Sequence, residues 1–263
     1  MTNERRVLVH PDKPSLAGSV AARFITKMID VIEDRGEATV VLTGGTMGIS
    51  ILAAIRDSSA RDSVDWKRVN VWWGDERWLP RDDAERNEKQ ARDALLDHIA
   101  LDEKRVHPFP AAGEGIELNE ASQLYASELA SHAAEGSTLP IFDITFLGLG
   151  PDGHIASLFP NRGGILEETL SVIAVRNSPK PPPERLSLTL PAINSSLRVW
   201  LVVAGADKAS ALGLTLADVS VHEVPASGAQ GRKRTLFFVD NEAAAEVPEN
   251  LTTPGLFWTG EDA

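Results

Sequence analysis

Short apolar runs alternate along the chain with longer segments in which hydrophobic and polar positions follow a helical repeat. The runs are rich in Val, Leu, Ile, Phe and Trp, as in strands that are buried on both faces of a sheet. Between them, apolar residues recur three or four positions apart, which indicates amphipathic helices. Strands are predicted at residues 6–10, 39–42, 69–73, 142–147, 199–203 and 236–239, with weaker candidates at 170–175 and 186–190. Helices are predicted at residues 12–36, 48–56, 87–99 and 118–129, and after the segment 205–210.

This order of elements indicates the fold class. Strands that alternate with helices predict a doubly wound α/β fold, with a mostly parallel sheet and helices on both faces. The first helix has end signals of its own, with Asp12 and Pro14 at its start and Gly36 after it. The proline-rich segment 179–183 is expected to form a stiff, extended bridge. Because no long polar linker or internal repeat divides the chain, we expect a single domain over residues 1–263.

Composition narrows the class of protein further. Hydrophobic residues make up 43% and charged residues 24% of the chain, which are ordinary values for a globular protein. No apolar stretch approaches the roughly 20 residues needed to cross a bilayer, and no apolar leader follows Met1. The chain has no cysteine, which excludes disulfides and thiolate metal sites and fits a cytoplasmic location.

The formal net charge of −12 argues against nucleic acids and anionic membranes as partners. We therefore expect a small-molecule ligand and a chain that is a monomer or a weak homo-oligomer. An anionic substrate would need a local cluster of basic side chains, because the chain as a whole would repel it.

A glycine-rich turn follows the predicted strand at residues 142–147. Gly148, Gly150 and Gly153 have the spacing of a dinucleotide-binding fingerprint, but Pro160 would cut short the helix that such a site needs. Asp152 would also place negative charge where a pyrophosphate should lie, and no acidic residue ends a strand about 20 residues further on. We therefore interpret the turn as a segment that positions titratable side chains for chemistry, rather than as a dinucleotide-binding site.

His154 is the candidate general base within that turn, because an imidazole titrates near neutral pH. Asp152, two residues earlier, could contribute to a metal site, but two ligands are too few to predict one. The remaining histidines are expected to be structural or exposed. They are His10, His98, His107, His132 and His222.

A second glycine-rich turn, Thr43–Gly48, lacks the lysine of a P-loop and has a threonine where a nucleophile elbow has serine. It is better interpreted as an anion cradle, in which glycines let the backbone approach a phosphate at a helix start. The alternative is a tight turn that binds nothing.

Charged residues follow other predicted strands at the same edge of the sheet. Asp75 and Arg77 come after the strand at residues 69–73, and Arg77 could bind an oxyanion or phosphate while Asp75 holds it in place. Arg185 and Lys208 are further candidates for the basic cluster. The alternatives are a solvated loop for the first pair and surface cations for the second.

Four motifs occur in order along the chain: Gly44–Thr46, Gly74–Pro80, Gly150–Pro160 and Arg185–Thr189. Together they resemble the 6-phosphogluconolactonase family, which shares a superfamily with glucosamine-6-phosphate deaminase. The resemblance extends from the first strand to Phe238, and the run Asp-Gly-His-Ile-Ala-Ser-Leu-Phe-Pro is its most specific part. The deaminases share Asp-Gly-His but continue into Phe-Asn-Glu-Pro, so the absence of that glutamate here favours the lactonase branch.

The resemblance implies hydrolysis of 6-phospho-D-glucono-1,5-lactone to 6-phosphogluconate in the oxidative pentose phosphate pathway, without a cofactor or metal. It also implies that His154 is the catalytic base. The oxyanion would be stabilised by Arg77 or by N–H groups of the turn at residues 148–153, and either Asp152 or Asp75 would orient the histidine. The implied phosphate-binding residues are Gly44, Gly45, Thr46, Arg185 and Lys208.

Three other functions stay open at this point. One is a dinucleotide-binding protein, which titration with nicotinamide cofactors would reveal. A deaminase would release ammonia from glucosamine 6-phosphate. A sugar-phosphate-binding regulator on the same fold would bind its ligand without turnover, but such regulators usually carry an added module for which this chain has no room.

Overall fold

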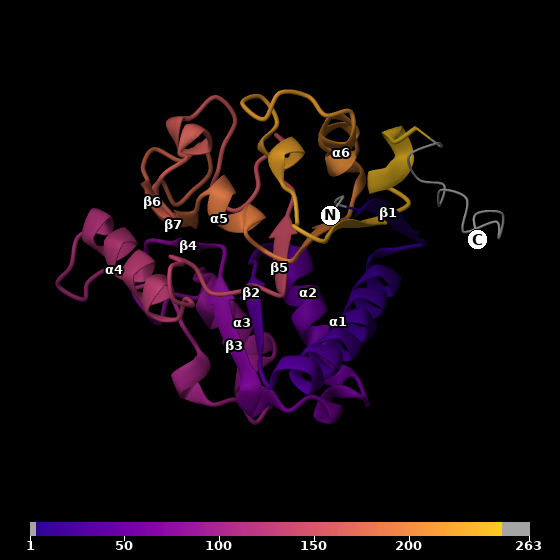
Figure 1. Cartoon of the computed structure of the whole chain (residues 1–263). Coiled ribbons are helices and arrows are strands. Elements are labelled where there is room, and N and C mark those ends of the chain that lie inside the picture. The colour runs from indigo at the N-terminus through magenta and orange to yellow at the C-terminus, as the bar shows by residue number, and fades with distance from the viewer. Residues whose placement is uncertain (1–3, 249–263) are drawn as a thin grey trace.

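The computed structural model describes residues 4–248. It has a central sheet of six strands, several of which are labelled in Figure 1. Every pair of neighbouring strands in this sheet is parallel. The order is β1 (Glu4–His10), β9 (Arg234–Asp240), β8 (Arg198–Val203), β5 (Ile144–Gly148), β2 (Ala38–Leu42) and β3 (Val69–Trp73). Helical segments separate these strands along the chain, so the predicted doubly wound α/β fold is confirmed.

The sheet has a point at which its connections diverge. From β2 the chain goes outward to β3, whereas from β5 it goes to β8 and β9 on the other side. The loops that follow β2 and β5 therefore separate, and such a switch point leaves a crevice outside the carboxyl ends of the strands. Both glycine-rich turns, at residues 43–48 and 148–153, follow these two strands.

Helix α1 (Lys13–Arg35) begins after Asp12 and ends before Gly36, as the sequence predicted. The side chain of Asp12 accepts a hydrogen bond from the backbone N–H of Ser15, and Gly36 ends the helix in the left-handed conformation, with φ at 84°. Its apolar face packs on the sheet, where the rings of Phe24 and Phe146 lie 5.6 Å apart. This packing fixes β5, the strand that leads into the glycine-rich turn at residues 148–153.

The other helices agree only in part with the predicted ranges. Helix α2 (Gly45–Asp57) begins within the glycine-rich turn at residues 43–48, and α4 (Leu118–Ser131) and α6 (Ala209–Leu216) lie where helices were predicted. The helix predicted at 87–99 is shorter, because α3 (Asn87–Ala94) stops at Leu95 and a 3₁₀ turn follows.

A small antiparallel sheet was not predicted. Its strands, in spatial order, are β4 (Asp75–Arg77), β7 (Arg185–Leu188) and β6 (Val172–Val175), and the short helix α5 (Leu190–Asn194) follows β7. The strands predicted at 170–175 and 186–190 are confirmed as β6 and β7, although β7 ends at Leu188, before α5. Residues 75–77, for which a solvated loop was the alternative to a binding role, form the short strand β4. In the β4–β7 register, Arg77 lies opposite Arg185, which brings two predicted site cations together.

No helix within residues 4–248 is long and apolar enough to cross a membrane.

Candidate active site

A cleft of about 460 Å³ lies at the carboxyl ends of the central strands. It contains eight of the nine predicted site residues, and only Asp152 is absent from its lining. Its charged and polar lining residues include Lys13, Gly44, Gly45, Thr46, Asp75, Arg77, Asn87, His154, Lys180, Arg185, Asp207 and Lys208. A larger cavity of about 740 Å³ elsewhere contains none of the predicted residues, so its size does not make it the better candidate.

Asp152 and His154 form a close pair within the turn that follows β5. The distance from Asp152 Oδ1 to His154 Nδ1 is 2.5 Å. Burial acts to raise the pKa of Asp152, but the hydrogen bond and charge of His154 and the charge of Lys180 hold it well below its usual range. An imidazole that donates from Nδ1 to this carboxylate keeps Nε2 available to accept a proton.

The glycines of this turn make room for the pair. A Cβ atom at Gly150 would lie 1.9 Å from His154 Nδ1, and Gly153 has φ at 84°, which favours glycine. The N–H groups of both glycines already donate within the turn, to the carbonyls of His154 and Gly150. These two N–H groups are therefore not free to bind an oxyanion, which leaves Arg77 and the other N–H groups of the turn as candidates.

Asp75 has a different set of contacts from the one predicted. Its carboxylate is buried and accepts hydrogen bonds from Ser157 Oγ at 2.7 Å and from Asn87 Nδ2 at 3.3 Å. It does not contact His154 or hold the guanidinium of Arg77. Of the two acidic candidates, Asp152 is thus the one whose geometry orients His154.

Lys180 and Arg185 connect the proline-rich bridge to the site. Lys180 Nζ lies 3.5 Å from His154 Nδ1 and 3.6 Å from Asp152 Oδ1. Arg185 is buried, which lowers its pKa, and its guanidinium donates hydrogen bonds to the carbonyls of Lys180, Pro181 and Pro182. Arg185 therefore positions Lys180 as well as lining the cleft.

The turn at residues 43–48 approaches Asn87 closely. A Cβ atom at Gly44 would lie 1.9 Å from Asn87 Oδ1, so a larger residue there would displace the Asn87 side chain. Among the described residues no side chain caps the start of α2, whose first-turn N–H groups therefore remain available for an anion. Asn87 Nδ2 also donates to the backbone carbonyl of Asp75, which ties the turns after β2 and β3 together.

Glu76 anchors the segment that carries Arg77. Its buried carboxylate accepts hydrogen bonds from the backbone N–H groups of Arg77, Asn87 and Glu88, at 2.7 to 2.9 Å, and lies 3.8 Å from Arg86 Nη2. Burial raises the pKa of Glu76 to about 7, against the charge of Arg86 and these N–H groups. Arg77 donates to the carbonyl of Glu85, while its Nε has no partner within residues 4–248.

Comparisons with known proteins identify the family. A model described as "Glucosamine-6-phosphate isomerases/6-phosphogluconolactonase" matches residues 11–238. The chain is 48% identical to a 6-phosphogluconolactonase of Streptomyces coelicolor, with 97% of this chain and 99% of the relative covered. The chain belongs to this isomerase/lactonase family. It is also 46% identical to a 6-phosphogluconolactonase of Mycobacterium leprae, over 92% of this chain and 98% of the relative.

Solved structures of the isomerase/lactonase family have the same fold. The crystal structure of a 6-phosphogluconolactonase from Thermotoga maritima superposes with a TM-score of 0.79 at 26% identity, covering 90% of this chain and all of that one. The resemblance stated from the four sequence motifs is therefore confirmed at the level of family and fold.

Four charged or polar residues of the cleft were not predicted as site residues: Lys13, Asn87, Lys180 and Asp207. Lys180 was assigned to a bridge, Asn87 to a helix start, and Lys13 to the first turn of α1. Only the run of prolines around Lys180 gave a signal, because a stiff segment can hold a side chain in a fixed place. Lys208, which was predicted, lines the cleft and pairs with Asp207 at 3.0 Å.

Proposed function

We propose that this chain hydrolyses 6-phospho-D-glucono-1,5-lactone to 6-phospho-D-gluconate in the cleft, as a step of the oxidative pentose phosphate pathway. The observation that carries the proposal is the Asp152–His154 pair in a cleft lined with cations, within a chain of net charge −12. Relatives that are 46% and 48% identical over nearly their whole length are named 6-phosphogluconolactonases, which supports the same assignment.

In the proposed mechanism, His154 removes a proton from a water molecule whose oxygen attacks the lactone carbonyl carbon. A tetrahedral oxyanion forms, and Arg77 stabilises its charge, since the N–H groups of Gly150 and Gly153 are already occupied. The bond from the carbonyl carbon to the ring oxygen then breaks, and His154 returns its proton to that oxygen. Asp152 holds the imidazole in the tautomer that both steps need.

The phosphate group is proposed to bind at some distance from this chemistry. It carries a charge of about −1.5 to −2 at neutral pH, so it needs donors and cations. The uncapped start of α2, at Gly44, Gly45 and Thr46, supplies donors, and Lys208 and Arg185 supply charge. Contacts far from the reacting carbon orient the sugar ring and reduce the entropic part of the barrier.

The family also contains isomerases that act on glucosamine 6-phosphate, so deamination is the competing function. The run Ser157-Leu-Phe-Pro160 stands here in place of the Phe-Asn-Glu-Pro of the deaminase branch. Phe159 stands where that run has its glutamate; it is buried and offers no carboxylate to assist ring opening. This local difference favours the lactonase.

The two functions are distinguished by their products. Wild-type protein is expected to release protons from freshly prepared 6-phospho-D-glucono-1,5-lactone faster than the spontaneous rate, and to release no ammonia from glucosamine 6-phosphate. Heat-unfolded protein at the same concentration is the control for buffer effects. Ammonia without excess proton release would overturn the proposal in favour of the deaminase, and neither product would favour a binding protein.

A further inference from the structure

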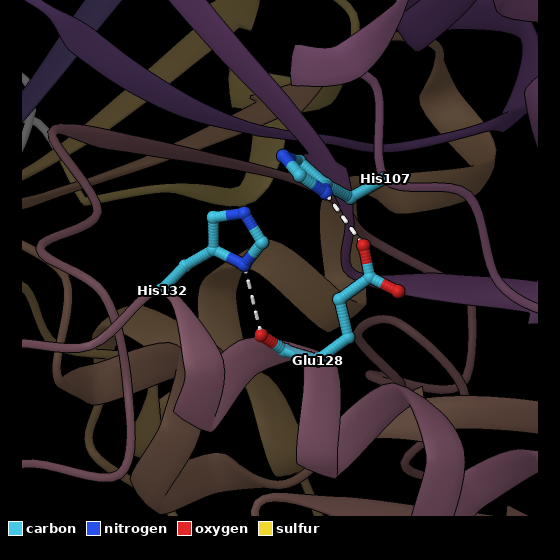
Figure 2. A group of neighbouring side chains, drawn as sticks. All are labelled: His107, Glu128 and His132. Carbon is cyan, nitrogen blue, oxygen red and sulfur yellow. Dashed lines mark hydrogen bonds and ion pairs between the residues drawn. The ribbon is translucent and has the colours of Figure 1, made fainter.

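A second cluster of ionisable side chains lies outside the cleft and shares no residue with it. Figure 2 shows His107, Glu128 and His132, of which two come from the end of α4 and one from the segment beside β3. One potential metal-ligating atom from each residue can be chosen so that all three lie within 4.8 Å of one another. All three residues lack a role in the proposed lactonase chemistry.

His107 is held rigidly. It is 3% exposed, its ring stacks on Trp72 with centroids 4.0 Å apart, and its backbone N–H donates to the carbonyl of Val71. Its Nδ1 lies 2.7 Å from Glu128 Oε1, whereas its buried Nε2 has no partner within residues 4–248. Contacts within the protein thus do not satisfy both nitrogens of this ring.

Glu128 and His132 can adjust their positions because both are exposed. They are four residues apart at the end of α4, so they project from the same side of the last turn. His132 Nδ1 lies 3.0 Å from the backbone carbonyl of Glu128 (Figure 2). A hydrogen bond from Nδ1 to a carbonyl fixes the tautomer and leaves Nε2 as the ligating nitrogen, an arrangement typical of metal-binding histidines.

We propose that His107, Glu128 and His132 bind a structural Zn²⁺ ion, with a solvent water as the fourth ligand. Two imidazoles and one carboxylate suit tetrahedral zinc, whereas Mg²⁺ and Ca²⁺ prefer sites made of oxygen ligands. Zinc bonds of about 2.0–2.2 Å place tetrahedral ligand atoms about 3.3–3.6 Å apart. The three ligand atoms lie within 4.8 Å of one another, so small rotations of the exposed Glu128 and His132 about the fixed His107 would bring them to that separation.

The surroundings leave room for the ion and its water. The cavity of about 740 Å³ opens beside this cluster and is lined in part by Trp72, Arg105 and His132. Three cations also line this cavity: Arg35, Lys104 and Arg105. Arg105 is paired with Glu37 at 2.7 Å and Arg35 with Asp143, so the charges of these two are partly neutralised. Glu128 brings the negative charge that a divalent cation needs.

The ion would connect α4 to the edge of the central sheet. His107 follows an isolated bridge between Val71 of β3 and Val106, and α4 packs against β6 of the small sheet. A zinc ion at this place would therefore link both sheets through one helix. Because binding occurs to the folded chain, it would raise the temperature of unfolding.

The test uses the full-length chain after treatment with a chelator. Zinc is titrated by calorimetry and by competition with a chromogenic chelator, and Co²⁺ serves as a spectroscopic probe of tetrahedral geometry. We expect one equivalent of zinc with a dissociation constant below about 10 µM. At a hundredfold excess over that constant, the unfolding midpoint should rise by about 5–10 °C. Millimolar Mg²⁺ should not compete.

Variants at the exposed ligands keep the test independent of folding, since His107 is buried and its replacement could prevent folding. His132→Ala and Glu128→Gln should each weaken zinc binding at least about tenfold. His98→Ala, at an exposed histidine outside the cluster, and His154→Ala, in the cleft, should bind zinc as the wild type does.

Three results would overturn the proposal. One is the absence of zinc binding at the stated concentration. Another is binding that His154→Ala removes and His132→Ala retains, because the metal would then lie at the Asp152–His154 pair. The third is binding that every variant retains, which would assign the ion to an unrelated surface position.

Discussion

His154 depends on neighbouring residues for its orientation. Asp152 contacts its Nδ1, Lys180 lies beside both, and Gly150 leaves the space that the imidazole occupies. The sequence placed Asp152 and His154 in one turn because they are two residues apart. It could not choose between Asp152 and Asp75, since that choice depends on how the turns after β3 and β5 meet in space.

Asp152→Asn should lower kcat more than it raises KM, because an amide does not hold the imidazole tautomer as a carboxylate does. We expect a loss of at least about tenfold in kcat, measured as proton release from fresh lactone. Asp75→Asn serves as the comparison, since it alters a buried contact with Ser157 and should mainly lower the unfolding temperature. A larger loss of kcat in Asp75→Asn than in Asp152→Asn would contradict this assignment.

At the scale of elements, the predictable parts are those with local signals. Helix α1 could be bounded because Asp12 and Gly36 define its ends through neighbouring residues. Two strands of the small sheet, β6 and β7, were predicted, but β4 and the pairing were not, because β4 has only three residues and pairs with β7 more than 100 residues later. Arg185 likewise holds Lys180 through a bend in the chain that the sequence pattern does not reveal.

Glu76 links β4 to the start of α3, and its raised pKa predicts that the stability of the protein depends on pH. The unfolded chain loses this proton near the usual value of 4.5, whereas the folded chain keeps it until about pH 7. The protonated carboxyl of Glu76 therefore stabilises the folded chain fully below about pH 4.5. This contribution to the free energy of unfolding falls as the pH rises above 4.5 and is lost once the pH passes about 7. The loss is at most about 3 kcal/mol.

Urea unfolding of the wild type and of Glu76→Gln between pH 4.5 and 8 measures this contribution. The free energy of unfolding of the wild type should fall relative to that of the variant across this range, because glutamine does not ionise. Glu120→Gln, at an exposed position on α4, should parallel the wild type. Parallel curves for the wild type and Glu76→Gln would show that the carboxyl is not perturbed as described.

At the scale of the whole molecule, charge is distributed unevenly. The chain has a net charge of −12, yet five cations line one cleft: Lys13, Arg77, Lys180, Arg185 and Lys208. The position of this cleft followed from the order of strands and turns, because the carboxyl ends of parallel strands meet at one edge. The sequence did not predict all five cations of the cleft, because Lys13 and Lys180 lie in segments without a site motif.

Lys208→Ala should raise KM for the lactone about tenfold and leave kcat nearly unchanged, because its proposed contact is with phosphate rather than with the reacting carbon. The effect should shrink as ionic strength rises, since salt screens the attraction. Lys233→Ala removes an exposed lysine outside the cleft and is the control for net charge. An equal change of KM in both variants would assign the effect to overall charge instead.

The central claim is that His154 performs the proton transfers of lactone hydrolysis. The most direct measurement is the rate of proton release from freshly prepared 6-phospho-D-glucono-1,5-lactone by His154→Ala, beside the wild type and His98→Ala. Loss of a general base predicts that kcat of His154→Ala falls by about 10²- to 10⁴-fold, while His98→Ala keeps the wild-type rate. A kcat of His154→Ala near that of the wild type would contradict the account.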